Sequence, residues 1–507
     1  MLAKVFSAAV NGIEVNEVVV EIDCSPGLPE FRLVGLPDAA VKESIDRVKA
    51  AIRNSGLDFP PRKITVNLAP ADIRKEGPSF DLPIAAAVLA ATGQVPAEAL
   101  DEYLILGELA LDGGVRGVSG ILPAVMQLCK IKKKALVPME NAREAAIVED
   151  MEIYGINTLS DLKDILLGLP KTPVPPPKEW LTEFTGADFG MDMSDVKGQA
   201  AARRAMEVAA AGGHNIMLIG PPGSGKTMLA RRLATILPPL TREEALETTT
   251  IYSVSGQLLG GRSFITSRQF RAPHHTISAA GMAGGGTYPK PGEVSLAHNG
   301  VLFLDEFPEF RREVLEILRQ PLEDQVVAIS RANSRMTYPA SFMLVAAMNP
   351  CPCGYAGDSR KQCRCSPQEI ARYMHKLSGP LLDRIDLHVD VPRLSEDELT
   401  DTRPAESSAA IRERVVRARG RQLERFRGTK VWCNARMTPA MLKSVPIEDS
   451  ASGLLRESVG KLSLSARAYD RVLKMALTIA DLEGKDVINT NHIAEAVNYR
   501  NLDRKYF

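Results

Sequence analysis

Short apolar runs alternate with helical stretches along the first third of the chain. The runs EVVVEID, KITVNLAP and KALVPME have the composition of strands, and the segments between them have helical spacing. This alternation predicts an α/β or α+β domain over residues 1–168. The proline-rich stretch LPKTPVPPPKEW follows, and residues 169–184 are predicted to form a semi-rigid linker.

Two further regions follow the linker. Buried strands alternate with helices over residues 185–395, which predicts a second α/β core. From residue 396 to residue 507 the pattern is mostly helical, so a helical region is expected to close the chain. The fold class expected from the pattern alone is therefore α/β.

The composition is that of an ordinary globular protein. Of the 507 residues, 45% are hydrophobic and 24% are charged, which fits about two to four domains. Positive and negative side chains number 62 each, so any surface for nucleic acid must be local. The longest apolar run, residues 82–92, is too short to cross a bilayer, and no signal peptide is evident. We therefore expect a cytoplasmic location and no membrane association.

The segment GPPGSGKT follows an apolar strand and opens a helix. In such a loop the backbone N–H groups surround a phosphate, and the helix N-terminus favours its negative charge. Lys226 is expected to reach the β- and γ-phosphates of ATP, and Thr227 to offer its hydroxyl to Mg²⁺. The candidate nucleotide-binding residues are Gly220, Pro221, Pro222, Gly223, Ser224, Gly225, Lys226, Thr227 and Asp305.

Two other strands end in polar residues suited to this chemistry. The strand in GVLFLDE delivers Asp305 to the metal ion and Glu306 to the attacking water. The strand in SFMLVAAMNP ends at Asn349, which is suited to sensing the γ-phosphate, although an asparagine that caps the next turn is the alternative.

These three motifs together resemble the AAA+ ATPases. The resemblance implies a ring, usually a hexamer, with ATP held between subunits and a helical lid after the core. The segment GPLLDRIDLHVDVP resembles the one that supplies an arginine finger to the neighbour's ATP, which here is Arg384. The segment SLSARAYDRVLKMA resembles the sensor-2 helix, which makes Arg467 a second phosphate-contacting arginine. Arg471 is the rival for that role, and a solvated helical arginine is the other alternative.

The segment between the GPPGSGKT and LFLDE motifs is long and rich in glycine, histidine and proline. It resembles the helix-2 insert of the AAA+ branch that holds the magnesium chelatases and the MCM helicases. A hairpin is expected just before the Asn349 strand, and residues 325–340 fit it, with Arg331 and Arg335 near the tip. In a ring, such tips gather positive charge around a pore that suits a DNA backbone. An ordinary solvated hairpin is the alternative.

The segments FRAPHHTISAAGMAGGG and AAMNPCPCGY closely resemble those of the ComM/YifB family. The resemblance covers essentially the whole chain. The resemblance implies a hexameric DNA helicase that promotes branch migration during recombination or natural transformation. His274 and His275 lie in the insert, where they are suited to touching DNA or the next subunit, or to a structural role. The alternative function is a chelatase-like motor that remodels a protein partner and ignores DNA.

The first domain resembles the Lon protease domain, which has a ribosomal S5 domain 2-like α+β fold. Ser79 in GPSFD falls where that family keeps its nucleophile. The lysine that would take the serine's proton falls at Ala124, and the nearest lysine, Lys130, is almost two helical turns further on. The domain is therefore expected to be proteolytically inactive, and Ser79 is expected to cap its helix.

Four cysteines crowd one short segment, CPCGYAGDSRKQCRC. Their thiolates have the number and softness for a tetrahedral Zn²⁺ site, although reduced free cysteines or a redox-active pair are the alternatives. The segment follows Asn349 directly, so a zinc ion there would stiffen the loop between sensor and arginine finger. The candidate zinc ligands are Cys351, Cys353, Cys363 and Cys365.

Overall fold

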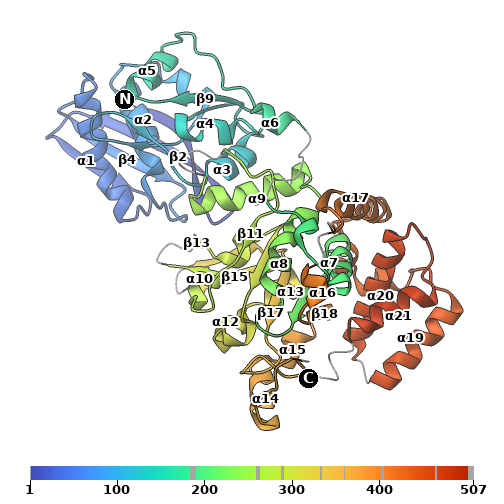
Figure 1. Ribbon diagram of the computed structural model, residues 1–507. Helices are drawn as coiled ribbons and strands as arrows, with labels where there is room; N and C mark the ends of the chain where they lie inside the picture. The colour runs from blue at the N-terminus through green and yellow to red at the C-terminus, as the bar shows by residue number, and fades with distance from the viewer. Residues whose placement is uncertain are drawn as a thin grey trace.

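The computed structural model describes residues 2–500, except 183–189, 259–262, 287–289, 332–333, 359, 401–402, 404 and 463–464. Within these residues the chain forms two large sheets, each with its own helices, three two-stranded ribbons and a C-terminal group of helices (Figure 1). Among the described helices, none is long and apolar enough to cross a bilayer.

The first sheet is mixed and has seven strands in the order β3-β4-β2-β1-β5-β8-β9. The β1–β2 hairpin and β4 pair antiparallel in its middle, whereas the edge strand β3 pairs parallel with β4 and the strands β1, β5, β8 and β9 pair parallel with one another. Its strands are β1 (Leu2–Asn11), β2 (Glu14–Ser25), β3 (Glu30–Val34), β4 (Lys63–Ala69), β5 (Tyr103–Ile105), β8 (Lys134–Pro138) and β9 (Glu152–Ile156). A small ribbon of β6 (Glu108–Leu109) and β7 (Val115–Arg116) lies beside it.

The helices of this unit are α1 (Ala39–Asn54), α2 (Asp81–Ala91), α3 (Ile121–Leu128), α4 (Met139–Ala145) and α5 (Leu159–Leu166). All residues of α2 are buried. After Asp81, whose carboxylate pairs with Arg47, the sequence is apolar on every side, and the helix packs against β1, β2 and α1. A mixed sheet with helices is therefore present where the alternating pattern predicts one.

The second sheet is fully parallel, in the order β11-β14-β17-β10-β18. Its strands are β11 (Phe270–Arg271), β14 (Val301–Leu304), β17 (Met343–Met348), β10 (Ile216–Ile219) and β18 (Leu387–Asp390). Every residue of β10, β14 and β17 is buried, as expected for parallel strands covered on both faces.

Alternate residues of these strands face two different cores. Ile216 and Leu218 pack with α7 (Ala200–Gly212), α8 (Lys226–Ile236) and the C-terminal helices. Met217 and Ile219 pack on the other face, with side chains from the segment between β11 and β17. The period of two along a strand thus sorts the residues between the layers.

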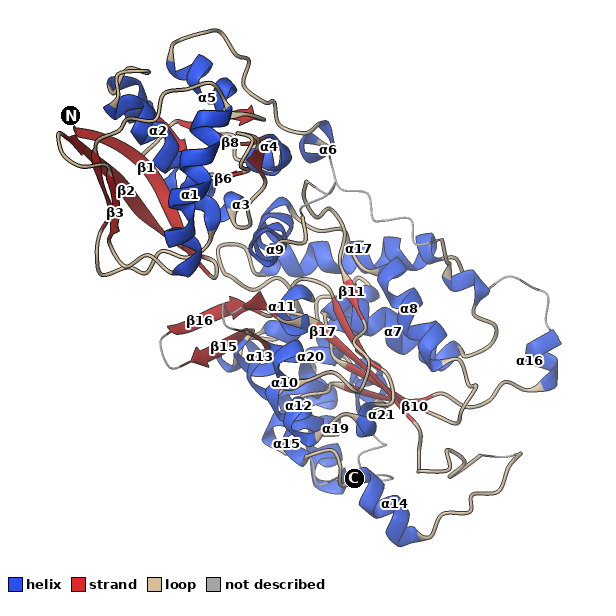
Figure 2. Ribbon diagram, turned by 90° about the vertical axis from the view of Figure 1, so that its left-hand side faces the viewer, coloured by secondary structure: helices blue, strands red, loops and turns tan. Residues whose placement is uncertain are grey.

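The elements around that second face are mostly short, apart from the fourteen-residue helix α9, which precedes β11. They are α9 (Arg242–Ser255), α10 (Ala279–Ala283), β12 (Gly284–Gly285), β13 (Lys290–Pro291), α11 (Glu293–Leu296), α12 (Arg312–Ile317), α13 (Arg319–Asp324), β15 (Val326–Arg331) and β16 (Ser334–Pro339). β15 and β16 form the expected antiparallel hairpin, which projects from the body in Figure 2. Its turn, residues 332–333, and the Arg331 side chain lie outside the described part.

The remaining helices are α6 (Lys178–Leu181), α14 (Pro367–Met374), α15 (Gly379–Leu382), α16 (Glu396–Thr400), α17 (Ser408–Arg425), α18 (Pro439–Leu442), α19 (Asp449–Leu462), α20 (Ala466–Leu482) and α21 (Thr490–Asn498). α17 and α20 pack on α7, and α17 also packs on α8, so the C-terminal helices extend the second core sideways (Figure 1).

The two units touch at several points. The Gly120 N–H donates to the Ser253 carbonyl at the end of α9, at 3.1 Å, and α3 packs on α9. The β1–β2 turn reaches the hairpin, where a Cβ on Gly12 would lie 3.3 Å from the Tyr338 hydroxyl. Trp180, in the stretch predicted to be a linker, is buried and packs edge-on against Phe264 at 5.5 Å. This tryptophan fastens the connecting segment to the second unit.

Candidate functional site

The glycine loop lies between the end of β10 and the start of α8. Gly223 and Gly225 have φ angles of +77° and +91°, a left-handed conformation that other residues rarely adopt, and Gly225 is the N-cap of α8. The Ser224 hydroxyl is buried and has no hydrogen-bond partner among the described residues. Free backbone donors at a helix N-terminus and an unpartnered buried hydroxyl suit a phosphate group.

Lys226 is buried beneath this loop. Its ammonium donates to the carbonyls of Gly220 (2.7 Å) and Pro221 (2.9 Å) and to Asn349 Oδ1 (3.2 Å). All three partners are neutral oxygens, so burial lowers the pKa of Lys226 to about 8, although nearby Asp305 favours the charged form. A bound phosphate would supply the missing negative charge.

The Asn349 side chain points toward Lys226 from the end of β17. Of the two roles that the sequence leaves open for this asparagine, this contact favours the one at the phosphate site.

Asp305 and Glu306 follow β14 directly. The Thr227 hydroxyl donates to Asp305 Oδ2 at 2.7 Å, which brings together the two oxygens expected to hold Mg²⁺. Glu306 has a φ of +53°, an uncommon value for a glutamate, and its Oε2 lies 3.1 Å from His275 Nδ1. The His275 ring lies against that of His274, with centroids 4.1 Å apart and the ring planes tilted by 34°.

The contact between His275 and Glu306 was not predicted. The two residues are thirty-one positions apart, and no local pattern in the sequence connects them. The insert thus brings an imidazole to the carboxylate that is expected to orient the attacking water.

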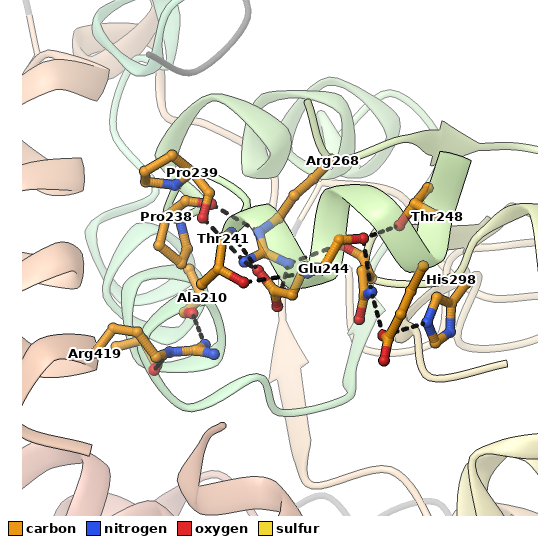
Figure 3. Close-up of polar contacts among 12 residues, drawn as sticks. Ala210, Pro238, Pro239, Thr241, Glu244, Thr248, Arg268, His298 and Arg419 are labelled. Carbon is orange, nitrogen blue, oxygen red and sulfur yellow. Dashed lines mark hydrogen bonds and ion pairs between the residues drawn. The ribbon is translucent and has the colours of Figure 1, made fainter. Parts of the chain in front are cut away.

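A network of polar contacts supports the base of the insert. The Arg268 guanidinium lies between Glu244, whose Oε2 is 2.7 Å away, and the carbonyls of Pro238 and Pro239 (Figure 3). It also donates to the Asn299 carbonyl at 2.8 Å. Both ends of the insert, at 268 and 299, are therefore held against the start of α9, and sequence reasoning missed this arginine as well.

The two candidate arginines lie at the opposite edge of the sheet from the glycine loop. The Arg384 carbonyl accepts a hydrogen bond from the Asn215 side chain, which precedes β10, whereas Gly220 follows β10. Four residues of strand separate these two ends by roughly 13 Å. Arg384 is 6% exposed and pairs with Glu323, and Arg467, which is more exposed, lies 3.5 Å from the same glutamate.

Arg384 and Arg467 line a cavity of about 300 Å³ between the core and the C-terminal helices. Arg471, the rival of Arg467, is engaged by Asp386 there. Burial disfavours the charged form of Asp386, but Arg471 and His214 outweigh it and hold the pKa of that carboxyl below its ordinary value. Arg471 therefore has a structural partner, and Arg467 is the freer of the two.

The four cysteines converge as the sequence analysis expects. The Sγ–Sγ distances are 3.4 Å for Cys351–Cys353, 3.7 Å for Cys351–Cys363 and 3.6 Å for Cys353–Cys363, and all four sulfurs lie within 4.8 Å of one another. A tetrahedral ion with bonds of about 2.3 Å to sulfur has sulfurs about 3.8 Å apart. The thiols are therefore spaced for a metal and are too far apart for disulfides.

Backbone N–H groups also point at these sulfurs. Those of Ala356 and Cys365 donate to Cys351 Sγ (3.3 Å) and Cys363 Sγ (3.4 Å). A hydrogen bond from the Arg364 N–H lowers the pKa of the Cys353 thiol to about 6. These donors favour the thiolate form that binds metal, whereas burial raises the pKa of the Cys351 thiol to about 12.

The prediction that Ser79 caps its helix is wrong. Pro78–Phe80 form a 3₁₀ turn whose N-cap is Gly77, with a φ of +80°, and α2 begins only at Asp81. Neither start has a side-chain cap, because the turn moves the helix beyond the reach of the Ser79 hydroxyl.

Ser79 instead lines a cavity of about 520 Å³ between the two units. Within the described part of the chain, Lys290 is the one lysine on its wall, and it comes from the second unit. Ala124 is fully buried on α3, where it offers no base.

A parallel β11-β14-β17-β10-β18 sheet with its glycine loop, acidic pair and helical extension defines an AAA+ ATPase of the magnesium-chelatase type. The family described as "Magnesium chelatase, subunit ChlI" matches residues 192–399, and its C-terminal counterpart matches residues 405–500. A third model, "Subunit ChlI of Mg-chelatase", matches residues 20–141.

Two relatives that match over nearly the full chain narrow the family assignment. The chain is 46% identical to "Competence protein ComM" of Haemophilus influenzae, over 99% of this chain and 98% of the relative. It is 44% identical to "Uncharacterized protein YifB" of Escherichia coli, again over 99% and 98%. The chain belongs to the ComM/YifB family. A partial likeness to "Lon protease 2" of Bacillus subtilis, at 27% identity, covers 27% of this chain and 24% of that protein.

Proposed function

We propose that this protein is a ring-forming, ATP-driven DNA translocase of the cytoplasm that promotes branch migration during homologous recombination or natural transformation. The observation that carries the proposal is the convergence of Lys226, Thr227, Asp305 and Asn349 at one end of the parallel sheet. The likeness to a protein named for competence over nearly the full chain supports the biological role.

In this proposal the glycine loop binds the ATP phosphates through its backbone N–H groups, and Lys226 donates to the β- and γ-phosphates. Thr227 and Asp305 would hold Mg²⁺, which neutralises charge on the phosphates. Glu306 leaves His275, accepts a hydrogen bond from the attacking water and orients it toward the γ-phosphorus. Asn349 donates its amide N–H to the γ-phosphate, which couples the position of β17 to the bound γ-phosphate.

Arg384 and Arg467 are proposed to act on the ATP of the neighbouring subunit. They lie at the edge of the sheet away from their own glycine loop, so only a second copy presents a phosphate to them. Arg384 then leaves Glu323 and contacts the neighbour's γ-phosphate, whose developing negative charge it stabilises. An active site completed by the next subunit favours a closed ring, which we expect to be a hexamer.

The hairpin is proposed to contact DNA. Arg335 is exposed, and the Arg331 backbone pairs with Ser334 next to the turn. Because the chain has no net charge, attraction to a DNA backbone has to come from such local groups, and a ring multiplies them around its pore.

The cysteine cluster is proposed to hold a structural Zn²⁺. Its sulfur spacing and N–H donors match the ion, whose role here is to fold the loop after β17.

A chelatase-like motor that remodels a protein partner remains the second candidate function, because the chelatase family models cover most of the chain. It predicts an ATPase that is indifferent to DNA.

Steady-state ATP hydrolysis separates the two functions. We would measure it for the protein alone and with single-stranded, duplex and four-way-junction DNA, each across a range of salt concentrations. The translocase predicts stimulation that fades with salt, followed by branch migration on the junction. Glu306→Gln should abolish hydrolysis but not ATP binding, while Glu309→Gln, a nearby exposed acid paired with Lys376, serves as the matched control. Hydrolysis that no DNA accelerates would rule out the translocase.

A further inference from the structure

The loop that carries the four cysteines forms a wall behind the glycine loop of the ATP site. We infer that the metal in this loop supports ATP binding, so that metal occupancy and nucleotide affinity are coupled. The inference rests on the zinc site and the ATP site proposed above and adds a physical connection between them.

The first connection runs along the chain. β17 ends at Met348, the Asn349 side chain accepts from Lys226, and Cys351 follows two residues later, fully buried. A ligand of the metal is thus fixed two residues from the side chain that touches the phosphate-binding lysine.

The second connection is a direct backbone contact. Gly354 has a φ of +84°, and a Cβ placed on it would lie 2.6 Å from Cδ and 2.7 Å from Cγ of Pro222. The same atom would lie 3.8 Å from Cγ of Asn349. The cysteine loop therefore rests its backbone on a proline of the glycine loop, at a distance that only a glycine permits.

The third connection ties the far side of the cysteine loop to the root of the glycine loop. Asp358 pairs with Arg393 at 2.9 Å, and the Arg393 guanidinium lies 5.5 Å from the Tyr355 ring centre. Two residues before Arg393, the Val391 N–H donates to the carbonyl of Ile219, the last residue of β10, at 2.7 Å. The cysteine loop is thereby attached at two places: to Pro222 within the phosphate-binding turn, and through Arg393 to the chain beside the end of β10.

The described part of the cysteine loop has no regular secondary structure. Between β17 and α14 its described residues form only turns and bends, without a helix or a strand. A cross-link among four side chains removes most of the conformational freedom of such a segment, and its loss returns that freedom. Without the metal, Gly354 is free to leave Pro222, and Asn349 loses the anchor that follows it.

The coupling has to be reciprocal. If the metal strengthens ATP binding by some factor, bound ATP must strengthen metal binding by the same factor. A nucleotide that orders the glycine loop should therefore slow the loss of zinc.

The experiment uses the full-length protein. Zinc content is measured by inductively coupled plasma mass spectrometry, and affinity for a fluorescent ATP analogue is measured before and after removal of metal by a mercurial reagent and a chelator. We expect about tenfold weaker binding after removal, as for couplings of ordinary size, and recovery on addition of Zn²⁺ but not of extra Mg²⁺.

The Gly354→Ala variant tests the contact between Gly354 and Pro222 without removing the metal. This variant should keep its zinc and still bind ATP at least about fivefold more weakly, because the added methyl group pushes the cysteine loop off Pro222. Gly428→Ala is the matched control, since it imposes the same positive φ at a site where a Cβ meets nothing within 4 Å.

The outcomes distinguish the inference from the proposals beneath it. Protein that neither contains nor takes up zinc would refute the zinc site, and protein that binds no ATP when zinc-loaded would refute the ATP site. Zinc that leaves without any change in ATP affinity would overturn the coupling alone. If removal of the metal unfolds the protein, the rate of zinc release is compared with and without a non-hydrolysable ATP analogue. Slower release with the analogue supports the coupling, and equal rates overturn it.

Discussion

Individual residues of the ATP site have properties that no motif records. Lys226 is charged, buried and surrounded by neutral oxygens, and Glu306 is turned toward His275 by a left-handed backbone. Both features depend on residues from other parts of the chain. They describe a site with a buried cation for a phosphate, in which the Glu306 carboxylate, proposed to orient the attacking water, is paired with His275.

The lowered pKa of Lys226 makes ATP binding sensitive to pH. Below the value of about 8 the free protein already carries the ammonium, whereas above it the lysine must gain a proton when the phosphates bind. The dissociation constant for ATP should therefore rise as the pH rises above about 8, approaching tenfold per pH unit. Fluorescence titrations between pH 7 and 9.5 measure this. Lys226→Arg should flatten the profile, and a flat profile in the unaltered protein would contradict the argument.

Removing the His275 imidazole should release Glu306. Exposed pairs of this kind contribute about 0.2–1 kcal/mol, so His275→Ala should raise DNA-independent ATP hydrolysis by up to about fivefold. His375→Ala, an exposed histidine at the end of α14, is the control and should leave the rate unchanged. A fall in turnover with His275→Ala would mean that the imidazole assists Glu306 rather than withholding it.

At the scale of elements, short irregular segments are held by long-range contacts. The insert is fastened at both ends through Arg268 and Asn299, and the four thiols of the cysteine loop converge within 4.8 Å of one another. The β15–β16 hairpin has a partner of its own in the β1–β2 turn, which meets Tyr338. These segments contain little regular structure, so their positions depend on such anchors.

The hairpin is expected to be the element that senses DNA. Replacing both Arg331 and Arg335 by alanine should remove most of the stimulation of ATP hydrolysis by DNA while leaving the DNA-independent rate intact. The salt dependence of binding should also become shallower, because fewer counterions are released. Arg74→Ala, an exposed arginine of the first unit, is the control. Unchanged stimulation in the double variant would assign DNA binding to another surface.

At the scale of the whole molecule, the two groups of residues proposed to complete one ATP site lie at opposite ends of the strands of the sheet. A single chain therefore presents the glycine loop on one side and the Arg384–Arg467 cavity on the other. This polarity is what a ring of identical subunits requires, because each interface joins the two different ends.

A mixing experiment checks the shared site. Lys226→Ala and Arg384→Ala proteins should each be inactive alone, since one lacks the phosphate contact and the other lacks the finger. In rings assembled at random from equal amounts of the two variants, about a quarter of the interfaces pair an intact glycine loop with an intact Arg384. About a quarter of the normal ATP hydrolysis should therefore return. Mixtures that stay inactive would argue against action in trans.

The sequence by itself determined the features that are local. A phosphate loop is a contiguous run of residues whose backbone conformation follows from its glycines, so its place between β10 and α8 was predictable, as were the two α/β patterns and the hairpin. Ser79 shows where local rules fail, because a serine near a helix start was predicted to be the cap, and a proline turn moved the start.

Only the tertiary structure decided which distant groups meet. It brought His275 to Glu306, Arg268 to both ends of the insert and Gly354 onto Pro222, and it set Arg384 and Arg467 on the edge away from their own ATP loop. These pairings depend on the order of strands in the sheet and on the close packing of loops around it. Neither follows from the residues next to each group, since a contact across the fold is chosen by the packing of the whole chain.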